Sequence, residues 1–132
     1  MRFAIFTHVL HTVEAGCYTA YSPYVREMNL WLRHVDEVEI VAPAPQPPKG
    51  EFIAKKTYRH SNIAFTQIPD FDLLNFRSTL KAFFKIPVII FRITGAMNRA
   101  DHLHLRCPGN IGLLACICQI FFPKKTKSAK YA

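Results

Sequence analysis

Short apolar runs alternate along the chain with longer segments in which apolar residues recur at helical spacing. Arg2–His8 is the first mostly apolar run, and Val38–Ala42 is a second one that is rich in β-branched residues. Runs of this kind are typical of strands buried on both faces of a parallel sheet. The same pattern predicts further strands at Phe52–Tyr58, Ile63–Ile68, His102–Arg106 and Lys127–Tyr131.

Helices are predicted between these strands. Ser22 and Pro23 are typical of a helix start, with serine as the cap and proline at the first helical position. Apolar residues then recur at helical spacing as far as Val35. Further helices are expected at Phe71–Phe84, from Pro87 to Asn98 and at Asn110–Phe122, whereas His11–Tyr21 and the proline-rich Pro43–Gly50 are expected to be irregular.

The alternation of strands and helices predicts the fold class. Parallel strands must be joined by right-handed crossovers, which place helices on the faces of the sheet. We therefore predict a single α/β domain over residues 1–132, with a Rossmann-like, doubly wound, mainly parallel sheet and helices on both faces. A chain of 132 residues that is 50% hydrophobic, with eleven Phe, can form one such core and is not disordered.

The net charge narrows the classes of partner. The chain carries 17 Lys and Arg against nine Asp and Glu, a formal charge of +8. This excess favours an anionic partner such as a nucleotide, a lipid phosphate or a membrane surface, or else it forms an ordinary basic surface. Because no RNA- or DNA-binding motif accompanies the charge, no nucleic-acid partner is expected.

Neither a secretory signal nor a membrane span is evident in the sequence. The most apolar stretches, Ile86–Ile93 and Ile111–Phe122, are shorter than the roughly 20 residues that cross a bilayer. Three of the four cysteines lie in or beside the second stretch, which favours reduced core thiols over disulfides. We therefore expect a cytoplasmic protein.

Candidate chemistry is concentrated in the segment HLHLRCPGNIG, residues 102–112. In a doubly wound sheet, ligands bind beyond the carboxyl ends of the strands, where the strand order reverses. If the first strand lies beside His102–Arg106, then His8, Gly16 and Arg106–Gly109 converge in that crevice. Gly109 and Asn110 would begin the next helix, whose free N–H groups and the Arg106 guanidinium together predict an anion site.

Alternation along the strand places His102, His104 and Arg106 on one face. Together with Cys107, the two histidines could form a metal site only with strain, and no carboxylate or Cys-x-x-Cys pair supports it. No metal is therefore expected. For His104 two interpretations stay open, a hydrogen-bonded core histidine and a functional side chain.

Three segments resemble the amino-terminal domain of the GT-B glycosyltransferases, in particular the large retaining family four. These are YVREMNLWLRH followed by DEVEIVAP near the start, and ADHLHLRCPGNIGLLA near the end. The strand Arg2–His8 and the glycine-bearing loop through Gly16, which precede the first of them, belong to the same resemblance. The resemblance extends over nearly the whole chain, is firm at these two ends and carries little signal over Pro43–Asn98. It implies that the chain is the acceptor-side half of a glycosyltransferase.

The resemblance also assigns residues. Gly16 matches the second of two glycines whose backbone meets the donor diphosphate, while Ala15 replaces the first. His104 matches a histidine that is frequent in the family's fourth strand. Arg106 stands where many members carry a catalytic histidine. Because a guanidinium cannot act as a base at neutral pH, Arg106 would hold a phosphate or an acceptor oxygen instead.

The implied activity is transfer of a sugar from a nucleotide-sugar to a glycan or lipid-linked acceptor, with neither a metal nor another cofactor. In this family a carboxyl-terminal domain with a paired-glutamate motif binds the donor, and no such motif occurs here. We therefore expect an incomplete amino-terminal domain that does not transfer sugar alone. The alternative is a non-catalytic module that binds an anionic ligand or a membrane surface, because fold does not determine function.

Two expectations concern surfaces. Basic and apolar residues are interleaved over residues 77–99, either as the sheet-facing side of core helices, which we prefer, or as a peripheral contact with the inner membrane face. The strand Lys127–Tyr131 should lie at a sheet edge, where unpaired backbone groups favour a homodimer.

Overall fold

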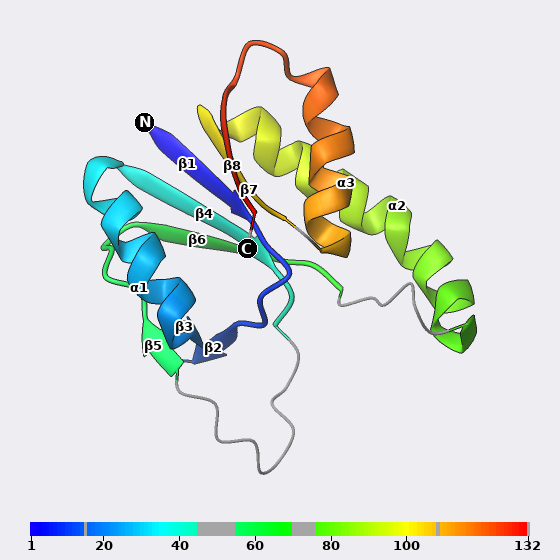
Figure 1. Ribbon diagram of the computed structural model, residues 1–132, viewed down its shortest axis with the longest axis horizontal. Helices are drawn as coiled ribbons and strands as arrows, with labels where there is room; N and C mark the ends of the chain where they lie inside the picture. Colours follow the sequence, from blue (N-terminus) through cyan, green and yellow to red (C-terminus); the bar gives the residue numbers. More distant parts are fainter. Residues whose placement is uncertain (15, 45–54, 70–75, 108, 132) are drawn as a thin grey trace.

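The computed structural model describes residues 1–14, 16–44, 55–69, 76–107 and 109–131. Its central sheet contains five parallel strands in the order β6-β4-β1-β7-β8. The order reverses between β1 and β7, so the sheet is doubly wound as predicted, and the first strand lies beside His102–Arg106 (Figure 1). The strands are β1 (Arg2–Phe6), β4 (Glu37–Ala42), β6 (Ile63–Gln67), β7 (His102–Cys107) and β8 (Thr126–Tyr131).

Helices cover both faces of this sheet (Figure 1). One face is covered by α1 (Ser22–Trp31) and a 3₁₀ turn at Leu32–His34. The other is covered by α2 (Phe76–Arg99) and α3 (Asn110–Cys118), with a 3₁₀ turn at Gln119–Phe121. The fold is therefore Rossmann-like α/β.

Two hydrophobic cores follow from this layering. Residues 3–6 of β1 and 38–42 of β4 are all buried, because a central parallel strand is covered on both faces. The α1 core contains Phe3, Ile5, Val38, Ile40, Tyr24, Met28 and Leu32. The α2–α3 core contains Ala4, Phe6, Val41, Leu103, Ile89, Ile93, Met97 and Ile111.

A second, antiparallel sheet was not predicted. Residues 11–21, expected to be irregular, contain β2 (Thr12–Glu14) and β3 (Cys17–Tyr21), and β5 (Lys55–Thr57) pairs with β3. Gly16 lies in the hairpin turn with φ 78°, a left-handed conformation that glycine adopts without strain. Strands of three and five residues are too short for their alternation to be recognised, so the sequence around Gly16 predicts a loop.

Two predicted helices are one helix in the structure. Helix α2 continues through Pro87, although a proline removes one N–H and leaves the carbonyl four residues earlier without its partner. Ile89, Ile93 and Met97 are buried at helical spacing after this proline. Burial of this face outweighs the lost hydrogen bond, so the prediction that Pro87 starts a helix is wrong.

Helix α1 begins one residue earlier than predicted, whereas helix α3 begins at Asn110 as predicted. Helix α1 begins at Ser22, with Tyr21 in the cap position and no side-chain cap, and Pro23 lies in its first turn as expected. Helix α3 begins at Asn110, so Gly109 is its cap. Parts of the predicted helix Phe71–Phe84, loop Pro43–Gly50 and strand Phe52–Tyr58 lie outside the described residues. These parts are residues 71–75, 45–50 and 52–54.

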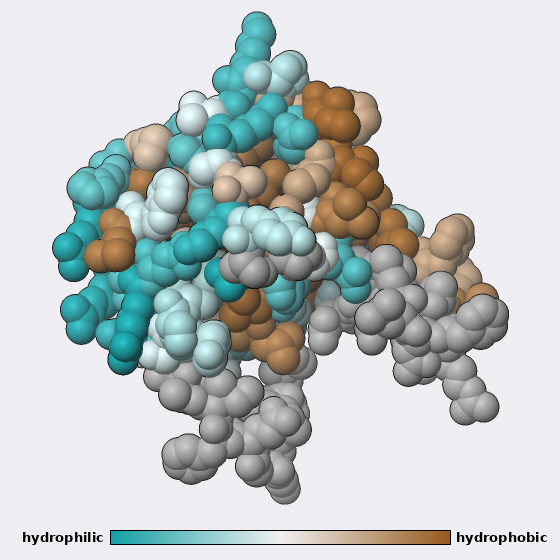
Figure 2. Space-filling view, viewed as in Figure 1, coloured by the Kyte–Doolittle hydropathy of each residue, from teal (hydrophilic) through white to brown (hydrophobic). Residues whose placement is uncertain are grey.

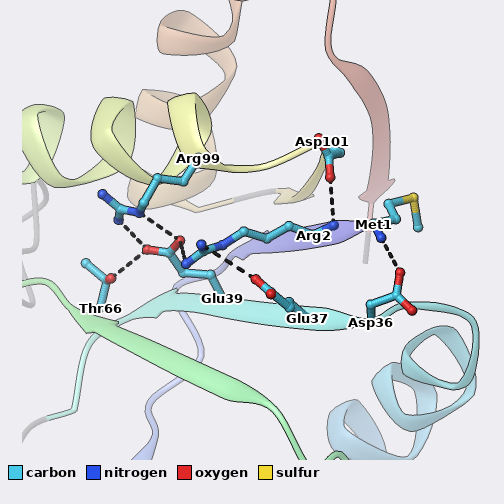
Figure 3. A network of polar contacts seen from close by, with 8 residues as sticks. All are labelled: Met1, Arg2, Asp36, Glu37, Glu39, Thr66, Arg99 and Asp101. Atoms are coloured by element: carbon cyan, nitrogen blue, oxygen red, sulfur yellow. Dashed lines mark hydrogen bonds and ion pairs between the residues drawn. The ribbon is translucent and has the colours of Figure 1, made fainter.

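A buried carboxylate ties the strands together toward their amino ends (Figure 3). Glu39 of β4 accepts hydrogen bonds from Arg2 (3.2 Å), from Thr66 (2.8 Å) and from Arg99 Nε (3.3 Å). Burial alone would raise the pKa of Glu39, but the hydrogen bonds from Arg99 and Thr66 and the charges of both arginines together lower it. The cluster therefore joins β1, β4, β6 and the end of α2 as a structural device.

Candidate site at the carboxyl edge of the sheet

The carboxyl ends of β1 and β7 meet at the reversal of strand order. Thr7 directly follows β1 and is buried; its N–H donates to the Val41 carbonyl (3.2 Å). The next residue, His8, is exposed. A Cβ built at Gly109 would come within 2.5 Å of His8 Nδ1. The His8 ring thus lies directly against the turn between β7 and α3, as the sequence predicted.

Two glycines let this turn pack closely. Gly109 has φ 157° and faces His8, so a side chain there would be strained and would clash. A Cβ at Gly112 would lie only 2.2 Å from the backbone oxygen of Arg106. The first turn of α3 therefore packs on the end of β7. The Leu113 N–H donates to the Gly109 carbonyl (2.8 Å), which begins the helical hydrogen bonding of α3 at this turn.

Arg106 is held over an aromatic ring at the same edge. Its guanidinium carbon lies 4.4 Å from the centre of the Tyr24 ring of α1, within the range of a cation–π contact. Within the residues that the structure describes, no carboxylate forms an ion pair with Arg106. The neighbouring cation, Lys130 of β8, is paired with Glu27 instead. Arg106 is thus positioned but not neutralised.

Beneath Tyr24 lies a buried polar cluster that sequence reasoning missed. His11 donates from Nδ1 to the Val9 carbonyl (2.7 Å), because a carbonyl can only accept, and its Nε2 therefore accepts from the Tyr58 hydroxyl (2.8 Å). Burial lowers the pKa of His11 to about 4 and raises the pKa of Tyr24 to about 12. Both stay neutral at physiological pH and support the site from below.

The Tyr24 hydroxyl itself is enclosed. No described residue makes a hydrogen bond of normal geometry to it, although the Thr7 and Tyr58 hydroxyls are close enough to affect the pKa of Tyr24. The only sequence signal for this cluster is the appearance of polar residues directly after β1. Their partners lie far along the chain and cannot be inferred from that signal.

His104 lies in the core, with 1% of its surface exposed. Its ring is 5.6 Å from the Phe3 ring and 5.1 Å from the Trp31 ring, and its Nδ1 lies 2.8 Å from the Ser128 hydroxyl. Burial, with a smaller contribution from the charge of His102, lowers its pKa to about 4. The structure therefore favours the core interpretation of His104.

Gly16 lines a different hollow from the β7–α3 turn. Thr57, Tyr58, His60 and Ser61 line it together with Gly16, and a Cβ at Gly16 would meet nothing within 4 Å. The structure thus brings Arg106, Gly109, Asn110 and His8 to one edge and places Gly16 in the hairpin turn.

Among the described residues, no three His, Cys, Asp or Glu side chains are grouped as a metal site. The two histidines of β7 instead share the Ser128 hydroxyl, His102 through Nε2 at 2.8 Å. All four cysteines are free: the thiols of Cys107 and Cys116 lie 3.6 Å apart, Cys118 is buried and Cys17 is exposed. In the part of the chain that is described, no helix is both long and apolar enough to cross a membrane.

Comparison of the chain with protein-family models, with curated proteins and with solved structures gives no match.

Proposed function

We propose that this chain is the acceptor-side domain of a GT-B glycosyltransferase of the retaining type. Together with a donor-binding domain it would transfer a sugar from a nucleotide-sugar to a glycan or lipid-linked acceptor. The proposal is supported by the resemblance of residues 24–43 and 100–115 and by the doubly wound sheet. The observation that carries it is the placement of an unneutralised Arg106 beside the amino end of α3, where strand order reverses.

The chemistry of this edge fits a phosphate-bearing substrate. A guanidinium binds two phosphate oxygens at once, and amides at a helix start donate to an anion with the helix dipole behind them. The glycines at 109 and 112 let the amino end of α3 pack directly against His8 and the end of β7, which holds these groups together at one edge. His8 is exposed beside this turn and offers a hydrogen-bonding group to an acceptor hydroxyl. His104, in contrast, would act by positioning β7 rather than by touching substrate.

Titration with inorganic pyrophosphate and with uridine diphosphate tests the anion site. We expect both to bind, and Arg106→Ala to weaken binding about tenfold or more, since a charge-assisted hydrogen bond contributes roughly 1.5–3 kcal/mol. Arg33→Ala is the matched control, because Arg33 is exposed in the 3₁₀ turn after α1. Equal affinities of the wild type and Arg106→Ala would contradict the proposal.

A non-catalytic module that binds an anion is the second candidate. It predicts the same pyrophosphate affinity but no saccharide binding. The glycosyltransferase proposal predicts that an oligosaccharide or a lipid-linked saccharide perturbs His8, which two-dimensional NMR of the histidine rings can measure. Absence of any saccharide effect at His8 would favour the module.

A further inference from the structure

Helix α2 has two opposite apolar faces. One contains Ile89 and Ile93 and is buried against the sheet. The other contains Leu80, Phe84 and Phe91, which are spaced by four and seven residues and so share one side of the helix. Their exposed fractions are 74%, 76% and 79%. The prediction that this segment is simply sheet-facing therefore holds for one face only.

Helix α3 and the turn after it extend the exposed apolar surface. The two helices pack side by side on the same face of the sheet. Figure 2 shows apolar side chains gathered along this side of the molecule. Phe83, Phe84, Phe91 and Phe121 alone expose on the order of 600 Å², taking roughly 200 Å² for an aromatic side chain. The exposed apolar residues of α3 and its turn are Leu113, Ile117, Ile120 and Phe121.

The charge around this surface has one sign. Between residues 76 and 131 the sequence has ten Lys and Arg, and Asp101 is its single acidic residue. Lys85 and Arg92 are spaced by seven residues along one flank of α2, whereas Arg99, next in the same row, is paired with Glu39. Lys124 and Lys125 follow the turn after α3. Arg92 and Lys125 donate to backbone carbonyls rather than to carboxylates, so their positive charge is not neutralised.

We propose that the outer sides of α2 and α3 form a binding surface for an anionic lipid bilayer. The phenylalanine side chains would enter the boundary between headgroups and acyl chains, while the flanking cations contact lipid phosphates. A second copy of the chain bound through the same surface would offer apolar side chains but no negative charge to these cations. An anionic bilayer has an apolar interior for the exposed apolar side chains and negatively charged headgroups for the flanking cations. It therefore matches both features of the surface.

The position of the surface relates it to the candidate site. Helix α2 runs opposite to the strands, so its first half lies toward the carboxyl edge, where α3 begins (Figure 1). A bilayer bound there would lie near the crevice. The inference stands without the proposed function, because it uses neither Arg106 nor the β7–α3 turn.

Vesicle flotation tests the proposal. The wild type should float with vesicles of equal parts phosphatidylcholine and phosphatidylglycerol, less well in high salt, and poorly with phosphatidylcholine alone. The double variant Phe84→Ser, Phe91→Ser should bind about tenfold more weakly or worse. Leu30→Ser, on an exposed position of α1 across the sheet, is the matched control and should bind as the wild type.

The charge-reversing Lys124→Glu, which leaves the apolar residues in place, should also weaken binding to the anionic vesicles. Both variants should keep the wild-type circular dichroism spectrum and urea midpoint, which shows that they fold. Any pyrophosphate binding of the wild type should be unchanged in them, which separates this inference from the proposed function. No flotation of the wild type, or equal flotation with both vesicle types, would overturn the proposal. Self-association that Phe84→Ser, Phe91→Ser abolishes, without vesicle binding, would assign the surface to a second copy instead.

Discussion

The guanidinium of Arg106, at the end of β7, stacks on the ring of Tyr24, in the first turn of α1, at 4.4 Å from its centre. Because Tyr24 is buried, the ring is a fixed platform rather than a mobile side chain. The contact holds one positive charge at the carboxyl edge without neutralising it. The ring of Tyr24 contacts Arg106, whereas its buried hydroxyl does not take part in that contact. Substitutions can therefore separate the effect of the ring on anion binding from the effect of the hydroxyl on stability.

Two substitutions of Tyr24 separate these effects. Tyr24→Phe keeps the platform and removes a buried hydroxyl that has no hydrogen bond with the described residues, so unfolding free energy should change by less than about 1 kcal/mol. Tyr24→Leu removes the platform and should weaken pyrophosphate binding by about threefold to tenfold, since an exposed to partly buried cation–π contact contributes roughly 0.5–1 kcal/mol or more. Urea unfolding and calorimetric titration measure the two quantities.

Equal pyrophosphate affinities of Tyr24→Leu and Tyr24→Phe would show that the ring does not position Arg106. A loss of several kcal/mol in Tyr24→Phe would show that its hydroxyl has a partner that the geometry does not reveal.

The two buried histidines predict a loss of stability in mild acid. His11 and His104 have pKa values of about 4 in the folded chain, against 6.5 for the free side chain. Between pH 6.5 and pH 4 the two histidines are protonated in the unfolded state but neutral in the folded state. The free energy of unfolding therefore falls as the pH is lowered from 6.5 to 4. Each histidine contributes up to roughly 3 kcal/mol to this loss. Above pH 6.5 neither contributes.

Urea midpoints measured across this pH range check the prediction. His104→Leu should reduce the pH dependence by about half, whereas substitution of the exposed His34 should leave it unchanged. A midpoint that does not vary between pH 6.5 and 4 would mean that both rings are accessible to protons in the folded chain.

Two helical glycines should respond oppositely to alanine. In an exposed helix alanine is favoured over glycine by about 1 kcal/mol. At Gly95 of α2 the new Cβ meets only the flexible end of Arg99 at 3.4 Å, so Gly95→Ala should be neutral or stabilising. At Gly112 it meets a backbone oxygen at 2.2 Å, so Gly112→Ala should destabilise by roughly 2–4 kcal/mol and shift α3. Thermal unfolding measures both, and equal stability of the two variants would contradict the close packing.

The sequence predicted the central sheet because its strands are buried on both faces. The apolar runs of β1 and β4 have no competing interpretation as amphipathic helices, being only five or six residues long. The alternation with helices predicted a doubly wound sheet. The approach of His8 to the β7–α3 turn was expected on the condition that β1 lies beside β7, which the structure meets, whereas Gly16 does not join them. Local pattern and global topology agree at these positions.

The features that were missed depend on contacts distant in sequence. Glu39 appears as one polar residue inside EVEIVA, and only the fold brings Arg2 and Arg99 to it. Likewise, His11 and Tyr58 are 47 residues apart. At Pro87 the local sequence signal is strong, because proline favours the start of a helix over its interior. Packing of α2 against the sheet nevertheless keeps the helix continuous through it. Secondary-structure propensity predicts the wrong element where a tertiary contact contributes more free energy than the local preference of the residue.

Self-association is expected through β8, which lies at one edge of the central sheet and is exposed along almost its whole length. Its outer backbone groups can pair with a second copy about a two-fold axis. Lys127 repels a like copy, but screened repulsion is typically below about 1 kcal/mol a pair, so salt should favour the dimer. Light scattering should show mass rising from 15.2 kDa toward twice that value with concentration.

Ala129→Lys adds a charge at the β8 edge and should weaken the dimer roughly fivefold. Ala64→Lys, at an exposed position of the opposite edge strand β6, is the control and should not weaken it. A monomeric mass at every concentration and salt level would show that the lysines protect this edge.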